Sequence, residues 1–366
     1  MPPNLLGGDM EKILVINPGS TSTKIAVFEE DKAVFSKTLR HSAEELKTFE
    51  RIIDQLEFRK KAILNALKEA GFDLNEFSAI AARGGLIHPV PSGTYLVNED
   101  MIKDLEESRY GEHASNLGAL IAKDIASKIG KKAYIVDPVV VDEMEEIARI
   151  SGLKGIKRKP LWHALNQKAV ARRVAKALGK KYEDANLVIA HLGGGISVAA
   201  HKKGKVVDAN NALNGDGPFS PERAGGLPTV SLAKLCYSGK YTFEEMKKNL
   251  AGKGGLVSHL GTNSAIEVEK MIEKGDSHAK LIYEAMAYQI AKTIGEMATV
   301  LEGKVDAVVI TGGLAHSDML VNWVKERVSF IAPVKVYPGE DEMKALAEGV
   351  LRVLKGEEKE KTYERI

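Results

Sequence analysis

The sequence predicts an α/β fold made of two related domains. Continuous apolar runs typical of buried strands alternate with segments of helical periodicity. A strand–turn–strand pattern near the start of the chain returns about 170 residues later, and internal similarity of this kind indicates a repeated structural unit. The length of 366 residues is sufficient for two domains that each bury their own core.

The first copy of the pattern predicts three successive strands. KILVIN at Lys12–Asn17 is a mainly apolar run, PGSTST is a turn of small and hydroxyl residues, and KIAVFE is the second strand. EEDK then forms a charged hairpin tip before the third strand, AVFSKTL. We expect the ordered chain to begin near Met10, with Met1–Asp9 as a flexible extension.

The second copy has different residues in the same layout. The apolar segments NLVIA (Asn186–Ala190) and ISVAA (Ile196–Ala200) flank the turn HLGGG at His191–Gly195. HKKGK forms the polar tip, and VVDANN is the next strand. We therefore expect two domains that each direct a small-residue loop at a shared cleft.

The remaining segments predict further strands and helices. Buried strands are expected at Ser78–Ala82, Ala133–Asp137 and Val305–Thr311. Helices are expected after a cap at Asn98, along the apolar stripe Leu117, Leu120, Ile121, Ile125 and Ile129, over Leu161–Leu178, after a cap at Ser317 or Asp318, and over Met343–Leu354. The Lys/Glu-rich segment Lys355–Lys361 is expected to be a solvated end.

The composition argues against several classes of protein. The formal net charge is +2 and no long Lys/Arg block occurs, which argues against a nucleic-acid partner. The single cysteine, Cys236, excludes an intramolecular disulfide and a cysteine zinc cluster. No run approaches the roughly 18 apolar residues of a membrane span, and the start lacks a secretory pattern. We expect a soluble, cytoplasmic protein without a membrane partner.

Three small-residue turns follow predicted strands, and each is suited to binding phosphate. HLGGG supplies three successive glycines, PGSTST supplies hydroxyls beside Asn17 and Lys24, and Gly312–Gly313 follows VVIT. Backbone N–H groups can contact phosphate oxygens only where side chains do not obstruct them. An ordinary hairpin or Ser/Thr turn explains any one of these turns alone, whereas the three together favour a nucleotide.

Two familiar nucleotide-binding motifs are excluded by their context. A dinucleotide fingerprint needs a helix after its glycines, whereas ISVAA is strand-like. No G-x-x-x-x-G-K-[ST] segment occurs, so a Walker-type loop is absent.

Cationic groups would be needed if a phosphoryl group is transferred, and two arginines are candidates. Arg83 in ARGG and Arg223 in ERAG lie next to small residues that would let a ligand approach closely. Asp137 ends a predicted strand, where ligands of open sheets gather. Each of these residues also has an ordinary structural explanation. The arginines could be surface residues, Asp137 could form a turn at Pro138, and His163 could have a core or capping role.

Together these segments resemble the acetate and butyrate kinase family from about Lys12 to Glu348, and NPGSTSTKIAVF at Asn17–Phe28 is especially similar to the butyrate kinase form. The resemblance implies duplicated ribonuclease-H-like domains with mixed sheets flanked by helices, as in sugar kinases, actin and heat-shock ATPases. It places residues 10–140 and about 343–366 in an N-terminal domain, and residues 141–342 in a C-terminal nucleotide-binding domain. The active site would lie in the cleft between them.

The resemblance also implies a role for each candidate residue. The catalytic residues would be Asn17, Arg83, Asp137, His163 and Arg223, supported by His113. The nucleotide would be bound by Ser20, Ser22, Lys24, His191, Gly193, Gly194, Gly195, Gly312 and Gly313. Magnesium would be bound by Asn17, Asp137 and Glu342.

The implied reaction is direct in-line transfer of the γ-phosphoryl group of ATP to a short-chain fatty acid, butyrate or a branched analogue, in a protein that is at least a dimer. The acid needs no general base, because carboxyl groups with pKa values of about 4 are ionised at neutral pH. Acetate kinases carry bulky β-branched residues where Gly84 and Gly85 follow Arg83, so we expect a larger acyl pocket. An acetate or propionate kinase, or a nucleotide-dependent binding protein of the same superfamily, remains an alternative.

Overall fold

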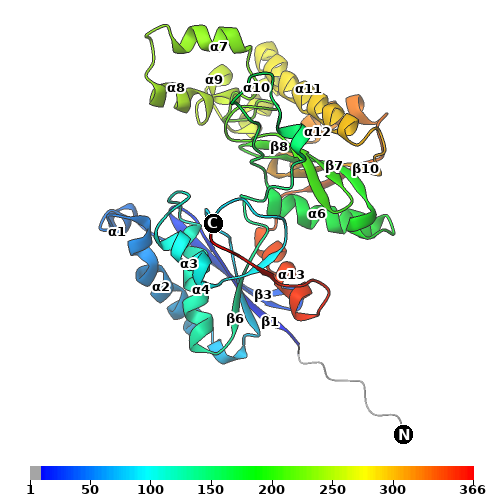
Figure 1. Ribbon diagram of the computed structural model, residues 1–366. Coiled ribbons are helices and arrows are strands. Elements are labelled where there is room, and N and C mark those ends of the chain that lie inside the picture. Colours follow the sequence, from blue (N-terminus) through cyan, green and yellow to red (C-terminus); the bar gives the residue numbers. More distant parts are fainter. Residues whose placement is uncertain (1–9) are drawn as a thin grey trace. The chain divides into compact units, whose positions relative to one another are not determined.

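The computed structural model describes residues 10–366 (Figure 1), and the predicted extension Met1–Asp9 lies outside the described residues. The chain divides into two compact units. The first contains the chain up to Val141 together with Asp341–Ile366, and the second contains Asp142–Glu340. Each unit has one mixed sheet flanked by helices, which confirms the predicted α/β fold class.

The first unit contains a seven-stranded sheet in the order β12-β5-β6-β4-β1-β2-β3. Its first three strands form the predicted antiparallel meander, and β4 and β6 extend the sheet in parallel with β1. Strand β5 is antiparallel to β6, and the edge strand β12 is parallel to β5. The strands are β1 (Lys12–Pro18), β2 (Ser22–Glu29), β3 (Lys32–Arg40), β4 (Ala79–Ala82), β5 (Thr94–Leu96), β6 (Lys132–Val136) and β12 (Lys361–Thr362).

Helices cover this sheet on both faces, which explains why β1 reads as an unbroken apolar run. Leu14 and Ile16 of β1 share one core cluster with Leu117 and Ile121. On the other face α13 lies so close to the sheet that a Cβ atom at Gly349 would overlap the side chain of Val136. The helices are α1 (Ala43–Leu46), η1 (Ile52–Gln55), α2 (Leu56–Glu69), η2 (Leu74–Glu76), α3 (Glu99–Glu106), α4 (Asn116–Lys128) and α13 (Glu342–Leu354).

The second unit contains a five-stranded sheet in the order β11-β10-β7-β8-β9. Here too an antiparallel meander is extended by two parallel strands. This order and these directions repeat those of β6-β4-β1-β2-β3, so the similarity between the two copies extends to five strands. The strands are β7 (Asn186–Leu192), β8 (Ile196–Lys202), β9 (Lys205–Ala209), β10 (Ala307–Gly312) and β11 (Val334–Pro338).

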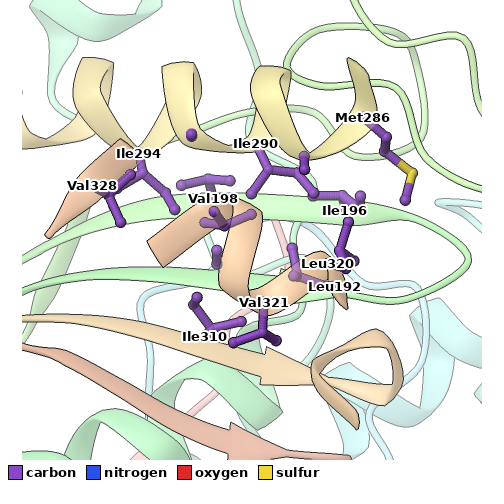
Figure 2. Packing of buried hydrophobic residues seen from close by; sticks show 14 of the residues in the cluster. Leu192, Ile196, Val198, Met286, Ile290, Ile294, Ile310, Leu320, Val321 and Val328 are labelled. Atoms are coloured by element: carbon purple, nitrogen blue, oxygen red, sulfur yellow. The ribbon is translucent and has the colours of Figure 1, made fainter. Parts of the chain in front are cut away.

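The core of the second unit lies between this sheet and its longest helix, α11 (Figure 2). Met286, Ile290 and Ile294 of α11 face Ile196 and Val198 of β8. The opposite face of the sheet packs against α6. The helices are α5 (Glu146–Arg149), α6 (Ala164–Ala177), η3 (Tyr182–Asp184), α7 (Thr229–Cys236), α8 (Phe243–Leu250), α9 (Gly255–Leu260), α10 (Ala265–Glu273), α11 (Ser277–Val300), η4 (Gly313–His316) and α12 (Asp318–Val328).

Helix capping follows the sequence at two predicted positions. The side chain of Asn98 accepts a hydrogen bond from the backbone N–H of Met101 at 3.0 Å, and Ser317 accepts one from Leu320 at 3.1 Å. Both bonds satisfy a donor that the first helical turn leaves unpaired. Within residues 10–366, no helix combines the length and the apolarity of a membrane-spanning segment.

The structure changes two local predictions: one helix begins later than expected, and one largely exposed segment also makes long-range contacts. The helix expected over Leu161–Leu178 begins only at Ala164, because Leu161 forms a β-bridge with Asn211. The segment Lys355–Lys361 is not simply a solvated end. Glu360 binds Lys132 and Tyr134, and Lys361 begins the edge strand β12. These contacts are long-range, so the local Lys/Glu composition gave no sign of them.

Candidate active site

The candidate residues fall into two sets, one in each unit. In the first unit they lie where β1, β4 and β6 end, because the carboxyl ends of parallel strands meet at one edge of a sheet. In the second unit they lie at the turn between β7 and β8 and at the ends of the elements beside it.

The first set begins with the turn between β1 and β2. The backbone N–H of Gly19 donates to the carbonyl of Ser22 at 2.7 Å and closes the turn. Ser20 and Lys24 are exposed, whereas Asn17 and Ser22 are half-buried. The turn therefore presents hydroxyl, ammonium and backbone groups together, as an anion site requires.

Arg59 of α2 holds this turn in place through hydrogen bonds, a role that was not predicted from the sequence. Its guanidinium donates to the carbonyls of Gly19, Ser20 and Ser22 at 2.7, 3.0 and 3.1 Å. It also donates to Thr23 and Gln55. The side chain is fully buried, and burial lowers the pKa of Arg59. No carboxylate in residues 10–366 pairs with it, so a buried positive charge lies directly behind the turn.

The structure brings Asn17, Arg83 and Glu342 together. Glu342 accepts a hydrogen bond from the side-chain amide of Asn17 at 2.9 Å and forms an ion pair with Arg83. The side chains of Arg83 and Glu342 are 31% and 26% exposed, so a ligand can reach both. His113 lies near Arg83, and burial together with the positive charge of Arg83 lowers the pKa of this histidine.

Asp137 follows β6 and is buried, with a φ of 38° that few non-glycine residues adopt. Its Oδ1 accepts hydrogen bonds from the hydroxyl of Ser92 at 2.5 Å and from the N–H of Gly93 at 2.8 Å. This carboxylate oxygen therefore holds the loop at Ser92–Gly93. The alternative predicted from the sequence was a turn at Pro138. The observed partners, Ser92 and Gly93, instead lie more than 40 residues earlier in the sequence.

Gly84 and Gly85 do not enlarge a pocket in the way the sequence suggested. A Cβ atom at Gly84 would lie 2.6 Å from Cβ of Pro138, and one at Gly85 would lie 2.6 Å from Cα of Asn116. The space beside these glycines is thus filled by the protein itself. Both residues are explained by the close packing of the chain after β4.

The second set contains the glycine turn and Arg223. A Cβ atom at Gly195 would overlap Nη1 of Arg223, so a glycine here lets the guanidinium lie against the backbone. Nη1 of Arg223 also donates to the carbonyl of Ala212 at 2.6 Å. Ser220 binds both the Gly194 carbonyl at 2.6 Å and the Arg223 N–H at 3.2 Å, and is a further residue that the sequence did not reveal.

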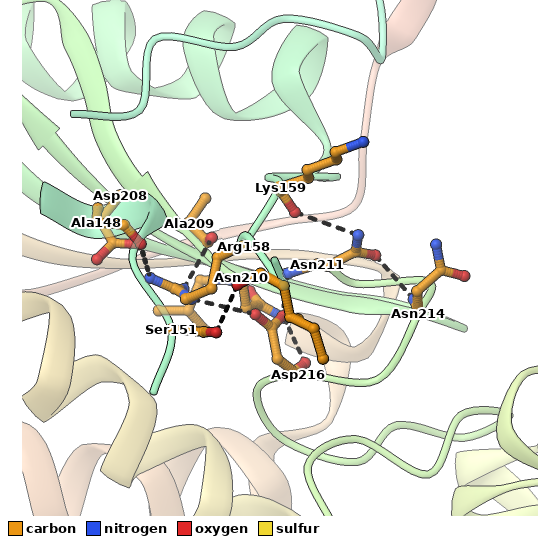
Figure 3. Close-up of polar contacts among 12 residues, drawn as sticks. Ala148, Ser151, Arg158, Lys159, Asp208, Ala209, Asn210, Asn211, Asn214 and Asp216 are labelled. Carbon is orange, nitrogen blue, oxygen red and sulfur yellow. Dashed lines mark hydrogen bonds and ion pairs between the residues drawn. The ribbon is translucent and has the colours of Figure 1, made fainter. Parts of the chain in front are cut away.

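A polar network anchors the segment that leads to Arg223 (Figure 3). The guanidinium of Arg158 donates to Asp208 at 3.0 Å and lies 3.5 Å from Asp216. Asp216 in turn binds the backbone N–H of Asn211. Burial raises the pKa of Asp208, and the charge of Arg158 opposes this effect. The network fixes the loop whose Ala212 carbonyl accepts from Arg223.

His163 and His191 form a stacked pair with ring centroids 3.7 Å apart and an interplanar angle of 9°. His191 is buried, and Asn166 binds its Nδ1 at 2.8 Å. Burial, and then the neighbouring His163, lower the pKa of His191 well below its ordinary value. His191 is therefore neutral at physiological pH.

The third predicted turn has one constrained glycine and one open glycine. Gly312 has a φ of 90°, and a Cβ atom there would overlap the backbone of Leu192. Gly313 is exposed, with nothing within 4 Å of the corresponding position. Gly313 is thus the one of the two that leaves space for a ligand.

The fold is shared with carboxylate and sugar kinases of known structure. The acetate kinase of Porphyromonas gingivalis matches with a TM-score of 0.76 and 22% identity, covering 94% of this chain and 100% of that chain. A propionate kinase from Francisella tularensis subsp. tularensis SCHU S4 matches with a TM-score of 0.73 and 19% identity, covering 93% and 99%. A ROK hexokinase from Thermus thermophilus matches with a TM-score of 0.51 and 14% identity, covering 94% and 99%.

The family follows from the sequence itself. The model of the acetokinase family matches residues 147–334, which is more than half of the chain. The protein belongs to the acetokinase family, and with it to the nucleotide-binding carboxylate kinases.

Proposed function

We propose that the protein transfers the γ-phosphoryl group of ATP to a short-chain fatty acid, with butyrate or a branched analogue as the preferred acid. The observation that carries this proposal is the cluster of Arg83, Asn17 and Glu342 beside the β1–β2 turn. It combines a cation for a carboxylate, a turn suited to phosphate and a carboxylate suited to magnesium. The alternative acids are acetate and propionate, which the relatives of known structure are named for.

In the proposed reaction a carboxylate oxygen attacks the γ-phosphorus, and the bond from this phosphorus to the β–γ bridging oxygen breaks. An acyl phosphate and ADP form, and no proton has to be removed from the acid. Arg83, Arg223 and His163 would stabilise the charge on the phosphoryl oxygens, because such transfer depends on positioning and electrostatics. We also propose that one nucleotide is bound by residues of both sets.

The residues present fit a magnesium ion. Mg²⁺ is usually bound through one or two carboxylates plus phosphate oxygens and water. The carboxylate of Glu342 and the side-chain oxygen of Asn17 are suited to bind it, and the Asn17 nitrogen donates to Glu342 at 2.9 Å. Asp137 is the further candidate. The ion would neutralise charge on the β- and γ-phosphates. Within the described residues no group of three or more His, Cys, Asp or Glu side chains is placed to bind a metal.

Binding of the acid would change the partner of Arg83. In the structure Glu342 already neutralises part of the arginine charge. A substrate carboxylate would compete with Glu342 for Arg83, and Glu342 would then become available to the metal. This exchange gives the ion pair a function in the reaction cycle.

The acid is identified by a panel of substrates. We expect the highest kcat/KM in an acyl-hydroxamate assay for butyrate or isobutyrate, compared with acetate, propionate and valerate. The basis for this order is the similarity of Asn17–Phe28 to the butyrate kinase form, because the packing of Gly84 and Gly85 removes the argument from pocket size. Highest activity on acetate would contradict the choice, and ATP hydrolysis independent of any acid would contradict the kinase.

We further propose that the protein is a cytoplasmic homo-oligomer. The helix α7 has no buried residue, and Val230, Leu235 and Tyr237 at this helix are exposed. Apolar side chains gathered on one surface often mark a contact with another chain. The exposed thiol of Cys236 is compatible with a reducing compartment. Light scattering after size-exclusion chromatography tests the assembly, and a monomer at micromolar concentration would contradict it.

A further inference from the structure

We infer that buried hydrogen bonds from Gln167 and Ser197, to which His201 and Tyr182 are connected, fix His163 as the tautomer that carries its proton on Nε2. The tautomer itself is independent of the enzyme's activity. Its catalytic meaning rests on the proposed function, in which His163 donates to the transferring phosphoryl group.

Gln167 determines which groups donate and which accept along this series of hydrogen bonds. Its amide approaches both the backbone carbonyl of Ser197 at 3.2 Å and the Ser197 hydroxyl at 2.9 Å. A carbonyl oxygen can only accept, so this end of the amide must be the NH₂ group. The other end is therefore the oxygen, Oε1.

This oxygen determines the protonation of His201. Oε1 of Gln167 lies 2.9 Å from Nε2 of His201, so Nε2 must donate. His201 is fully buried, and burial, followed by the charges of Lys168 and Arg172, lowers its pKa well below the ordinary value. The neutral ring then accepts at Nδ1, where the hydroxyl of Tyr182 donates at 2.8 Å.

At the other end of this series of hydrogen bonds, the hydroxyl group of Ser197 has only one acceptor to which it can donate its proton. Its oxygen accepts from the Gln167 amide and from the backbone N–H of His163 at 3.3 Å. These two bonds use both acceptor positions of a hydroxyl oxygen. Its own proton must therefore go to Nδ1 of His163, which lies 2.8 Å away. With Nδ1 as an acceptor, the proton of the neutral ring is on Nε2.

His191, the ring stacked on His163, is held in the same tautomer by a separate set of contacts. The hydroxyl of Thr311 donates to the carbonyl of Gly339 at 3.2 Å and therefore accepts from Asn166 at 3.3 Å. The Asn166 nitrogen that donates there also donates to Nδ1 of His191. Both stacked rings thus carry a proton on Nε2, and Nε2 of His191 lies 3.4 Å from Glu340.

The tautomer matters because a phosphoryl oxygen accepts hydrogen bonds. An Nε2–H group can donate to this oxygen. An unprotonated Nε2 would instead place its lone pair against a lone pair of the phosphoryl oxygen, which is repulsive. Ser197 and Gln167 are therefore positioning residues that act through His163. In serine proteases, the wrong histidine tautomer lowers kcat by about 10⁴.

Long-range ¹H–¹⁵N correlation spectra of the full chain with ¹⁵N-labelled histidine test the inference directly. His163 is assigned by its absence in His163→Gln. We expect its Nδ1 to have the shift of an unprotonated nitrogen and its Nε2 that of a protonated one. A proton on Nδ1 in the unsubstituted protein would overturn the inference, whether or not the enzyme phosphorylates any acid.

Two variants separate positioning from a structural role. Ser197→Ala removes the donor to Nδ1, and we expect mixed tautomers of His163 and a fall in kcat of about tenfold or more, with little change in KM. Tyr182→Phe also removes a buried hydroxyl from the chain, but it leaves the direction at Gln167 unchanged. We expect the Tyr182→Phe spectrum of His163 to match the unsubstituted protein. An unchanged spectrum in Ser197→Ala, or a switched tautomer in Tyr182→Phe, would contradict the proposal.

Discussion

Individual side chains determine the charge at the edge of the first unit's sheet where β1, β4 and β6 end. Arg83 directly follows β4, and its side chain is partly exposed to solvent and paired with Glu342. Because the pair is only partly buried, its Coulomb energy is screened, and its removal should affect ligands more than folding.

Arg83→Ala should lower kcat by about a hundredfold or more, since one lost charge-stabilising contact costs roughly 2.7–4 kcal/mol in barrier. The midpoint of thermal unfolding should change little, because neither Arg83 nor Glu342 is fully buried. The hydroxamate assay and a thermal scan check both expectations. Near-normal turnover would remove Arg83 from the mechanism.

Gly195 gives a second test at this scale. Gly195→Ala would introduce a Cβ atom where the guanidinium of Arg223 lies, so we expect at least a tenfold loss of kcat/KM with the fold retained. Gly226→Ala is the matched control, because its Cβ atom would make only an ordinary 3.6 Å contact with Gly217. Equal effects in the two variants would show that the contact with Arg223 is unimportant.

At the scale of elements, α2 organises the β1–β2 turn through Arg59. Three turn carbonyls accept from one buried guanidinium, so the turn and the helix form one polar unit. The charge behind the turn would also favour a bound phosphate, since few mobile charges can screen it in the interior.

Arg59→Met should destabilise the protein and weaken ATP binding. The carbonyls of Gly19 and Ser20 would lose this donor, whereas that of Ser22 keeps the Gly19 N–H. A buried carbonyl left without a partner costs about 1–3 kcal/mol, and the turn at Gly19–Thr23 should exchange its amide hydrogens faster. Lys61→Met on the exposed side of the same helix is the control. Urea unfolding and hydrogen exchange measure both effects. If Arg59→Met resembles Lys61→Met in both measurements, the proposed role of Arg59 is wrong.

The elements also show which features a sequence reveals. Both meanders were predicted because alternation, turn residues and apolar runs are local patterns. The roles of Arg59 and Ser220, the strand β12 and the packing of Gly84 depend on residues distant in the chain. Arg59 stands beside Lys60 and Lys61, and this basic group is typical of a solvated helix face.

At the scale of the whole molecule, buried histidines link stability to pH. The pKa values of His191 and His201 are well below their ordinary value in the folded chain, chiefly because of burial. An unfolded histidine titrates near pH 6.5, so below about pH 6.5 the unfolded state binds more protons than the folded state. Their contribution to stability is therefore complete above about pH 6.5 and decreases as the pH falls.

We expect the free energy of unfolding to fall between pH 7.5 and 5.5, before most carboxylates titrate. His201→Gln should reduce this slope, whereas His278→Gln, at an exposed position on α11, should preserve it. Urea unfolding at several pH values measures the slope. A stability that rises on acidification would contradict the buried, neutral state of these histidines.

The central claim is that one nucleotide is bound by the turns of both units. Hydrogen–deuterium exchange with a non-hydrolysable ATP analogue, Mg²⁺ and butyrate tests it most directly. We expect simultaneous protection of Asn17–Lys24 and His191–Gly195, stronger with all three ligands than with the nucleotide alone. Protection of only one of these turns at saturating ligand would contradict the claim.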